Sequence, residues 1–193
     1  MNKAFVKEGD DDLLSPLPEM PTGVRNYITP GGYQHMQTEL RNLLGSLHSA
    51  TLALADERSP DADLIEGSAE QNVRELEQRI HYLQTRLDTA EIVDPAVHAG
   101  EKQIFFGARV TYENEHKESR TVTIVGLDEL DPDQGKISWL SPVAQALLNA
   151  FEGDSVVLKS PAGDEKLHIS TVLFPSQVEP DADAAGLTNN GLE

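Results

Sequence analysis

Apolar residues recur along residues 30–90 at alternating steps of three and four. The repeat keeps its phase from Tyr33 to Leu54, and a second repeat of the same kind runs from Ala69 to Ala90. A 3.5-residue repeat places its apolar members on one stripe of a helix, and that stripe packs on a matching partner stripe. The first seam is Tyr33, Met36, Leu40, Leu43, Leu47, Ala50 and Leu54, and the second is Ala69, Val73, Leu76, Ile80, Leu83, Leu87 and Ala90. The pattern predicts two long, paired helices.

The residues around the seams predict where these helices begin and how they are joined. Thr29 is suited to cap a helix, and Pro30 loses no hydrogen bond at the first helical position. Between the seams, Pro60 cannot continue a helix, and Ser59 or Asp61 is suited to cap the second one. A short connection makes the helices antiparallel neighbours. We therefore expect an antiparallel coiled-coil hairpin over residues 26–95, with arms of roughly 42–45 Å.

Beyond Asp94-Pro95 the helical repeat gives way to short apolar and β-branched runs separated by turn residues. We expect strands over 105–112, 120–126, 136–140, 155–160 and 166–174, and a short helix over 141–148. Short turns between successive strands predict an antiparallel sheet with one helix packed on it. The fold class is therefore α+β, with a C-terminal domain over residues 103–175.

Composition limits the classes of function. The 193 residues carry a net charge of −18, which opposes non-specific binding to duplex DNA. Any contact with nucleic acid then requires a small local patch or another protein. Cysteine is absent, so disulfides and thiolate metal sites are excluded. No apolar run approaches the roughly 20 residues that cross a membrane, and an acidic N-terminus replaces a signal sequence. We expect a soluble, cytoplasmic protein with flexible acidic tails over 1–25 and 176–193.

Several short motifs, in order, resemble the bacterial Gre transcript-cleavage factors, which bind RNA polymerase. Asn26-Tyr27-Ile28-Thr29-Pro30, followed by Gly32-Tyr33, is similar to the opening of the first arm in Gre B-like factors. The C-terminal pattern follows with Ile124-Val125-Gly126, Asp128-Glu129, Ile137-Ser138, Ser141-Pro142, Gly153-Asp154, Pro161 and Gly163. Each piece alone is weak, but their succession behind a helical hairpin is specific and spans about Asn26 to Phe174.

The resemblance implies a fold and a mode of action. The hairpin would enter the secondary channel of the polymerase, and an FKBP-like C-terminal domain would grip the rim through Ser141 and Pro142. Two acids at the tip, Glu57 and Asp61, would help hold the catalytic Mg²⁺ while the polymerase cleaves backtracked RNA. Asp56 and Asp63 are further candidate ligands. On this interpretation the chain is a monomeric accessory factor with no turnover or cofactor of its own, and it meets the RNA only indirectly.

The tip departs from the pattern of the family. Gre B-like tips usually read Gly-Asp-Arg-Ser-Glu-Asn-Ala-Asp-Tyr, so Glu57 stands at the first acid and Pro60 at the second, with Asp61 one residue away. A gapped alternative makes Asp56 the first acid. No lysine or arginine occurs from Ser59 to Val73, although the family is often basic there. Leu140 occupies a position that is commonly acidic in the family.

Three functions stay open at this stage. The first is stimulation of RNA cleavage, and the second is a cleavage-deficient relative that occupies the same channel and modulates transcription. The third is an FKBP-like scaffold or folding helper on a helical spacer. Without the resemblance, the tip acids are a solvated turn with helix caps. The six histidines form no pair four residues apart on one helix, and we assign them no chemistry.

Overall fold

The computed structural model describes residues 20–56, 63–160 and 163–175. The chain forms two compact units. The first contains Asn26 and Tyr33–Ala90, and the second contains Tyr27–Gly32 and the chain from Glu91 onward. The fold is α+β, as the sequence predicts. The short segment Tyr27–Gly32 belongs to the second unit, whereas the sequence analysis assigns it to the hairpin.

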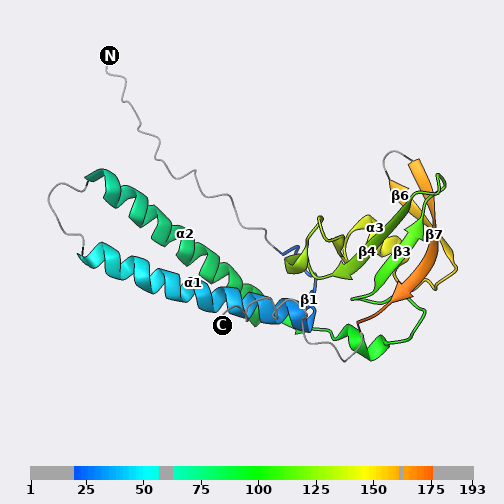
Figure 1. Cartoon of the computed structure of the whole chain (residues 1–193), viewed down its shortest axis with the longest axis horizontal. Coiled ribbons are helices and arrows are strands. Elements are labelled where there is room, and N and C mark those ends of the chain that lie inside the picture. Colours follow the sequence, from blue (N-terminus) through cyan, green and yellow to red (C-terminus); the bar gives the residue numbers. More distant parts are fainter. Residues whose placement is uncertain (1–19, 57–62, 161–162, 176–193) are drawn as a thin grey trace, which may run out of the picture. The chain divides into compact units, whose positions relative to one another are not determined.

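Two long helices, α1 (Pro30–Asp56) and α2 (Asp63–Asp88), make up most of the first unit. They run side by side in opposite directions (Figure 1). The start of α1 is confirmed, because the Gly32 N–H donates to Thr29 Oγ1 at 3.0 Å. All members of the two predicted seams are buried or half-buried. The heptad pattern thus identifies the faces on which the two helices meet.

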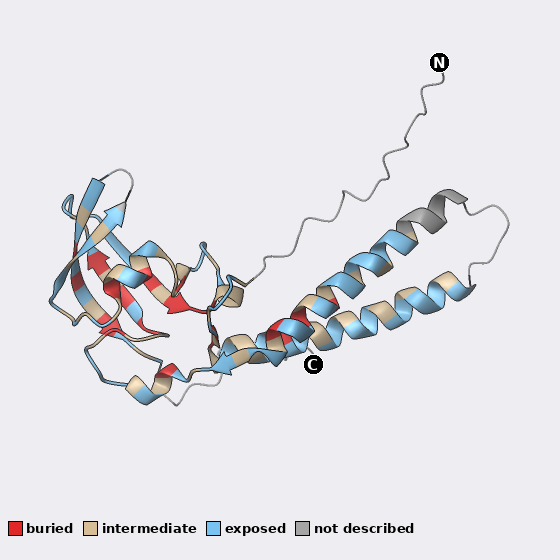
Figure 2. Cartoon of the chain, turned by 180° about the vertical axis from the view of Figure 1, so that it is seen from behind, coloured by how far each residue is buried: buried red, intermediate tan, exposed pale blue. Residues whose placement is uncertain are grey.

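Burial in the hairpin is strongest where α1 begins and α2 ends. Met36, Ile80 and Leu83 are the buried apolar side chains in the described parts of the two helices. The red segments of the hairpin in Figure 2 lie at this end. The Arg79 guanidinium joins the helices by an ion pair with Glu39, with 2.8 Å between nitrogen and oxygen. Arg86 is buried beside Asn26, whose side-chain amide donates to the Arg86 carbonyl at 2.8 Å. This end of the hairpin therefore holds both its apolar core and its buried polar contacts.

Three short elements here are absent from the sequence prediction. The strands β1 (Asn26–Ile28) and β2 (Ala90–Ile92) form a two-stranded sheet, and η1 (Pro95–His98) is a turn of 3-10 helix. The strands have only three residues each, which is too short for a period-two pattern to emerge. None of the described helices is long and apolar enough to span a membrane.

The second unit is built on a five-stranded sheet in the order β5-β4-β3-β7-β6. The strands are β3 (Arg109–Glu113), β4 (Ser119–Val125), β5 (Lys136–Ser138), β6 (Ser155–Ser160) and β7 (Gly163–Leu173). The prediction of a wholly antiparallel sheet is wrong at one pair, because β4 and β5 are parallel. Residues 126–135, which include the 3-10 turn η2 (Leu127–Glu129), lie outside the sheet. They lead the chain back to the end of the sheet at which β4 begins, so that β5 runs parallel to β4.

One face of this sheet carries the core. Val110, Ile124, Ile169 and neighbouring apolar side chains are fully buried there. The short helix α3 (Pro142–Leu147) adds Ala144 and Leu147 to the same cluster. The opposite face is mainly exposed and polar. Among the described residues, the second unit thus has one helix packed on one face of its sheet, and the other face is mainly exposed.

Candidate functional site

The predicted tip acids lie at the connection between α1 and α2. Asp56 is the last residue of α1 and Asp63 is the first residue of α2, so α1 ends and α2 begins where the acids are expected. Glu57 and Asp61 lie outside the described residues, as do the side chains of Asp56 and Asp63. The described residues contain no group of three or more histidine and acidic side chains that could hold a metal ion. The metal role of the tip stays a prediction.

The half of α1 that leads to this connection is free of formal charge. From Asn42 to Ala55 the helix has no Asp, Glu, Lys or Arg. Leu44 and Leu52 are 45% and 58% exposed on it. The facing half of α2 is acidic, with Glu66, Glu70 and Glu75. The stretch from Asn42 to Ala55 therefore adds no like-charge repulsion against these glutamates.

Ser141 and Pro142 form the start of α3. The Ala144 N–H donates to Ser141 Oγ at 3.2 Å, and Pro142 follows at the first helical position. This confirms the start signal read from the sequence. Ser141 is half-buried, whereas Pro142 is exposed. The cap uses the serine hydroxyl as an acceptor, and the proline ring lies exposed beside it.

Backbone and side-chain hydrogen bonds hold the loop before α3 in one conformation. Ser138 is buried, and its hydroxyl accepts from the Leu140 N–H at 3.1 Å. The Gln145 side-chain amide donates to the Trp139 carbonyl at 2.7 Å. The Trp139 indole packs on the Tyr27 ring with 5.1 Å between centroids, and its buried Nε1 has no hydrogen-bond partner among the described residues. Ser141 and Pro142 are thus presented by a fixed turn rather than by a free loop.

Sequence reasoning missed a second polar site at Glu129, although it noted the residue as part of a motif. The carboxylate of Glu129 accepts from the Thr29 N–H at 2.9 Å, from the Gly126 N–H at 3.1 Å, and from the Thr29 hydroxyl. A side chain at Gly32 would overlap Glu129, so the glycine leaves the room that the carboxylate fills. Glu129 therefore anchors the first turn of α1 within the second unit. No local sequence signal links residues 100 positions apart.

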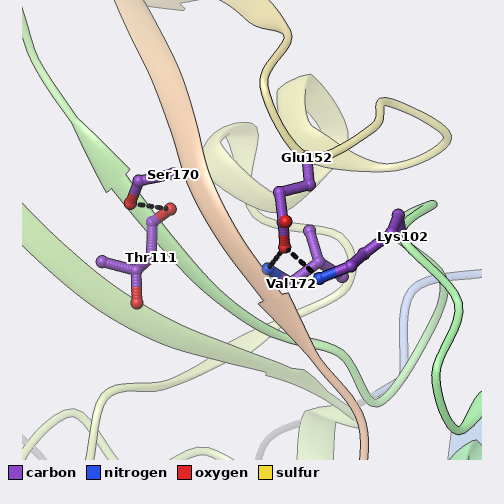
Figure 3. Close-up of polar contacts among 5 residues, drawn as sticks. All are labelled: Lys102, Thr111, Glu152, Ser170 and Val172. Carbon is purple, nitrogen blue, oxygen red and sulfur yellow. Dashed lines mark hydrogen bonds and ion pairs between the residues drawn. The ribbon is translucent and has the colours of Figure 1, made fainter.

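Another acidic residue, Glu152, accepts a hydrogen bond from the backbone at the edge of β7. Its carboxylate accepts from Lys102 Nζ and from the Val172 N–H, each at 2.9 Å (Figure 3). The hydrogen bond from Lys102, followed by that from Val172, holds the pKa of Glu152 below its usual value. β6 pairs with β7 only up to His168, so Glu152 replaces the missing strand as an acceptor. This is a structural role, because Glu152 satisfies a backbone donor of the sheet.

Comparisons with known proteins identify relatives over most of the chain. Residues 99–174 match the family described as transcription elongation factor, GreA/GreB, C-terminal. Transcription elongation factor GreB of Neisseria meningitidis serogroup B is 39% identical over 161 residues, covering 80% of this chain and 98% of that protein. GreA of Anaeromyxobacter sp. (strain K) is 35% identical over 158 residues, covering 79% of this chain and 95% of that protein.

A solved structure of the transcription factor Gfh1 is 27% identical and covers 77% of this chain and 97% of that chain. Its TM-score of 0.37 is too low to support a conclusion about the fold. The assignment of the chain therefore depends on the sequence relatives, which match both the helical hairpin and the sheet unit.

Proposed function

Because this chain belongs to the GreA/GreB family of transcription elongation factors, we propose that it binds RNA polymerase and stimulates the cleavage of backtracked RNA by the polymerase. The observation that carries the proposal is the 39% identity to a GreB factor along nearly its whole length. The chain acts as an accessory, since the reaction is the polymerase's own. Its place of action is the cytoplasm, and it works as a monomer.

In this proposal the hairpin is a probe that enters the secondary channel of the polymerase. Helix α1 has 27 residues, which corresponds to roughly 40 Å at 1.5 Å per residue. On this proposal the seams on α1 and α2 form a coiled coil, whose buried side chains lie where α1 begins and α2 ends. The uncharged half of α1 and the half-exposed leucines suit a narrow passage between protein walls, because they require no counter-charges.

The tip contributes carboxylates to a metal that belongs to the polymerase. Glu57 and Asp61, with Asp56 and Asp63 nearby in sequence, supply only oxygen donors, and these are the ligands that Mg²⁺ prefers. When bound, such a metal supplies activation of water and stabilisation of charge on the phosphate. The carboxylates themselves hold the metal and orient the attacking water. A further role of the carboxylates is to accept a proton from this water. The contact with backtracked RNA is therefore indirect.

The second unit holds the factor to the rim of the channel through Ser141 and Pro142. We assign it an FKBP-like arrangement, with α3 packed on the sheet. Two observations support the contact: Pro142 is exposed, and the turn before it is fixed by Ser138 and Gln145. Leu140 stands where the family commonly has an acid, so an apolar contact replaces a charged one at this position.

A second candidate function is a channel binder that slows or modulates transcription without promoting cleavage. The observation that favours it is Pro60 at the position of the second tip acid, together with the lack of lysine and arginine from Ser59 to Val73. A displaced carboxylate loses much of its effect on metal chemistry, because displacements of about 1 Å already cost roughly 100-fold in rate.

Stalled, backtracked polymerase complexes separate the two functions. The factor is added and the RNA length is followed, in parallel with a binding assay by co-migration with the polymerase. Cleavage stimulation predicts faster shortening of the RNA than with polymerase alone. Unchanged shortening with slowed elongation contradicts it and supports the modulator. The variant Pro142→Ala, which keeps the Ser141 cap, is expected to weaken co-migration more than Glu152→Gln, which lies on the same unit.

A further inference from the structure

The open face of the five-stranded sheet carries a patch of cations and hydroxyl groups, which we call the threonine face. The strand register defines it. Thr123 on β4 lies between Arg109 on β3 and Lys136 on β5 as a Cα partner of both. In the next row, Thr111 lies between Thr121 and Thr171. The strand positions of these two rows carry no carboxylate, and Leu173 is their only large apolar side chain. Beyond the strands, Asp131 is the bridge partner of Lys136, and Glu113 lies one row further along β3.

The hydroxyls of the threonine face are organised by the sheet. Thr111 and Thr121 share a hydrogen bond of 2.9 Å between their hydroxyl oxygens. The register between β3 and β7 shifts at Thr111/Tyr112, and Ser170 occupies the bulge. The Ser170 hydroxyl donates to the Thr111 carbonyl at 3.0 Å (Figure 3). The rows are thus rigid, and no described side chain covers the exposed Arg109 and Thr121.

The cations of this face have no ion-pair partner among the described residues. The chain as a whole has 33 acidic and 15 basic residues. Elsewhere in the described chain, Arg74, Arg79 and Lys102 each pair with a glutamate. On the sheet, neither Arg109 nor Lys136 lies within ion-pair distance of a carboxylate. An external anion would therefore meet two positive charges that are not held in ion pairs among the described residues, with Asp131 as the bridge partner of Lys136.

We propose that the threonine face binds the phosphate backbone of a single-stranded nucleic acid. Neighbouring strands lie about 4.8 Å apart, so the Cα atoms of Arg109 and Lys136 are separated by about 10 Å. Both side chains are long enough to reach one phosphate above Thr123. The guanidinium offers two parallel donors, the ammonium offers a point charge, and the hydroxyl offers a third donor. This contact goes beyond the proposed function, which brings RNA only to the hairpin.

The chemistry of the face favours nucleic acid over an acidic protein segment. Protein docking sites have an apolar centre, whereas these two rows offer hydroxyls and cations with one leucine at their border. Hydroxyl, lysine and arginine side chains are typical of phosphate contacts. No aromatic side chain lies on the two rows, so bases are not stacked and the contact is independent of sequence. The net charge of −18 disfavours a duplex, whose charge density is higher than that of a single strand.

The test measures binding of a fluorescently labelled 12-nucleotide RNA, of mixed sequence, to the full chain without polymerase. At low salt we expect weak binding that falls as salt rises. Two neutralised phosphates give a slope of about −1.4 in a plot of log affinity against log salt. The double variant Arg109→Gln/Lys136→Gln is expected to lose roughly tenfold in affinity and most of this slope. Thr123→Val, which removes only a hydroxyl, is expected to lower the affinity for RNA a few-fold.

The double variant Arg41→Gln/Arg74→Gln is the matched control, because it removes the same charge from the hairpin. It is expected to bind like wild type. The proposal is overturned if wild type does not bind at low salt, or if the control loses as much affinity as the sheet variant. It is also overturned if a glutamate-rich peptide displaces the RNA at lower concentration than unlabelled RNA does, because the face would then serve an acidic protein segment. Unfolding curves of all variants establish that each is folded.

Discussion

The two units differ in how deeply they bury the same kinds of side chain. In the sheet unit, Ile104, Ile124 and Ile169 are 0% exposed, and α3 adds Leu147 at 0%. In the described hairpin, Leu83 is 1% exposed, but Leu52 towards the connection is 58% exposed. A pair of helices has one seam, and each seam residue keeps water at its sides, whereas a sheet covered by a helix encloses its core. The sheet unit is therefore expected to be stable by its own core, whereas the hairpin depends on the buried side chains where α1 begins and α2 ends.

The largest expected effect comes from the core of the sheet unit. Ile169→Ala removes a fully buried side chain from the core cluster of the sheet unit and leaves a cavity, so the free energy of unfolding should fall by about 2–5 kcal/mol. Leu52→Ala, in the exposed part of α1, should change it by less than about 0.5 kcal/mol. Urea unfolding, followed by the single tryptophan, Trp139, and by helical circular dichroism, measures both. Equal effects would contradict the contrast between the units.

A second comparison lies within the hairpin. Leu83→Ala at the base should cost about 2–4 kcal/mol, because the side chain is 1% exposed. Leu47→Ala, at a seam position of α1, should cost about 1 kcal/mol, since Leu47 is only half-buried. Thermal unfolding of the helices, read at the helical dichroism band, separates the two variants. A larger loss for Leu47 would mean that the seam is packed as tightly near the connection as at the base.

The Glu129 anchor is expected to have an intermediate effect. Glu129→Ala leaves the Thr29 and Gly126 donors without their acceptor and should cost about 1–3 kcal/mol. Gly32→Ala should destabilise as well, because its new methyl group meets Glu129. Once Glu129 is alanine, the methyl group has room. The double variant should therefore lose less than the sum of the single losses, and additive losses would show that the two residues do not compete for space.

The smallest expected effect is a dependence of stability on pH through Glu152. The pKa of this carboxyl is lowered in the folded state, so its contribution is present at neutral pH. It begins to fade below about pH 4.3, the usual glutamate value, and is lost as pH falls through the folded-state pKa. The difference in unfolding free energy between wild type and Glu152→Gln should therefore shrink from pH 7 to pH 3. A difference that grows on acidification would contradict the assigned hydrogen bonds to Lys102 and Val172.

Periodic features of the chain were predictable from sequence, and contacts between distant residues were not. The heptads predicted α1 and α2, and Thr29 and Ser141 predicted two helix starts, because caps act over three residues. The parallel pairing of β4 and β5 was missed, because the sequence of a short strand does not indicate whether it pairs parallel or antiparallel with its neighbour. The contact of Glu129 with Thr29 was missed for a similar reason: it depends on the folded path of the chain.

The residues of the candidate site show the same difference between what local sequence patterns predict and what the folded chain adds. Ser141 and Pro142 were predictable as a helix start, but the fixed turn that presents them required Ser138 and Gln145 to be seen in place. The tip acids were identified only through the family resemblance, because acids beside a turn are commonplace. Glu57 and Asp61 lie outside the described residues, so their roles depend on experiment.

The rate of RNA shortening in backtracked polymerase complexes tests the central proposal most directly. The measurement compares wild type with Glu57→Ala and Asp61→Ala, and uses Asp88→Ala as a control that removes the same charge at the far end of α2. The proposal predicts that wild type and the control accelerate shortening, while each tip variant co-migrates with polymerase but loses roughly 100-fold of the acceleration. Acceleration that is equal in wild type and both tip variants, or absent in wild type, would contradict it.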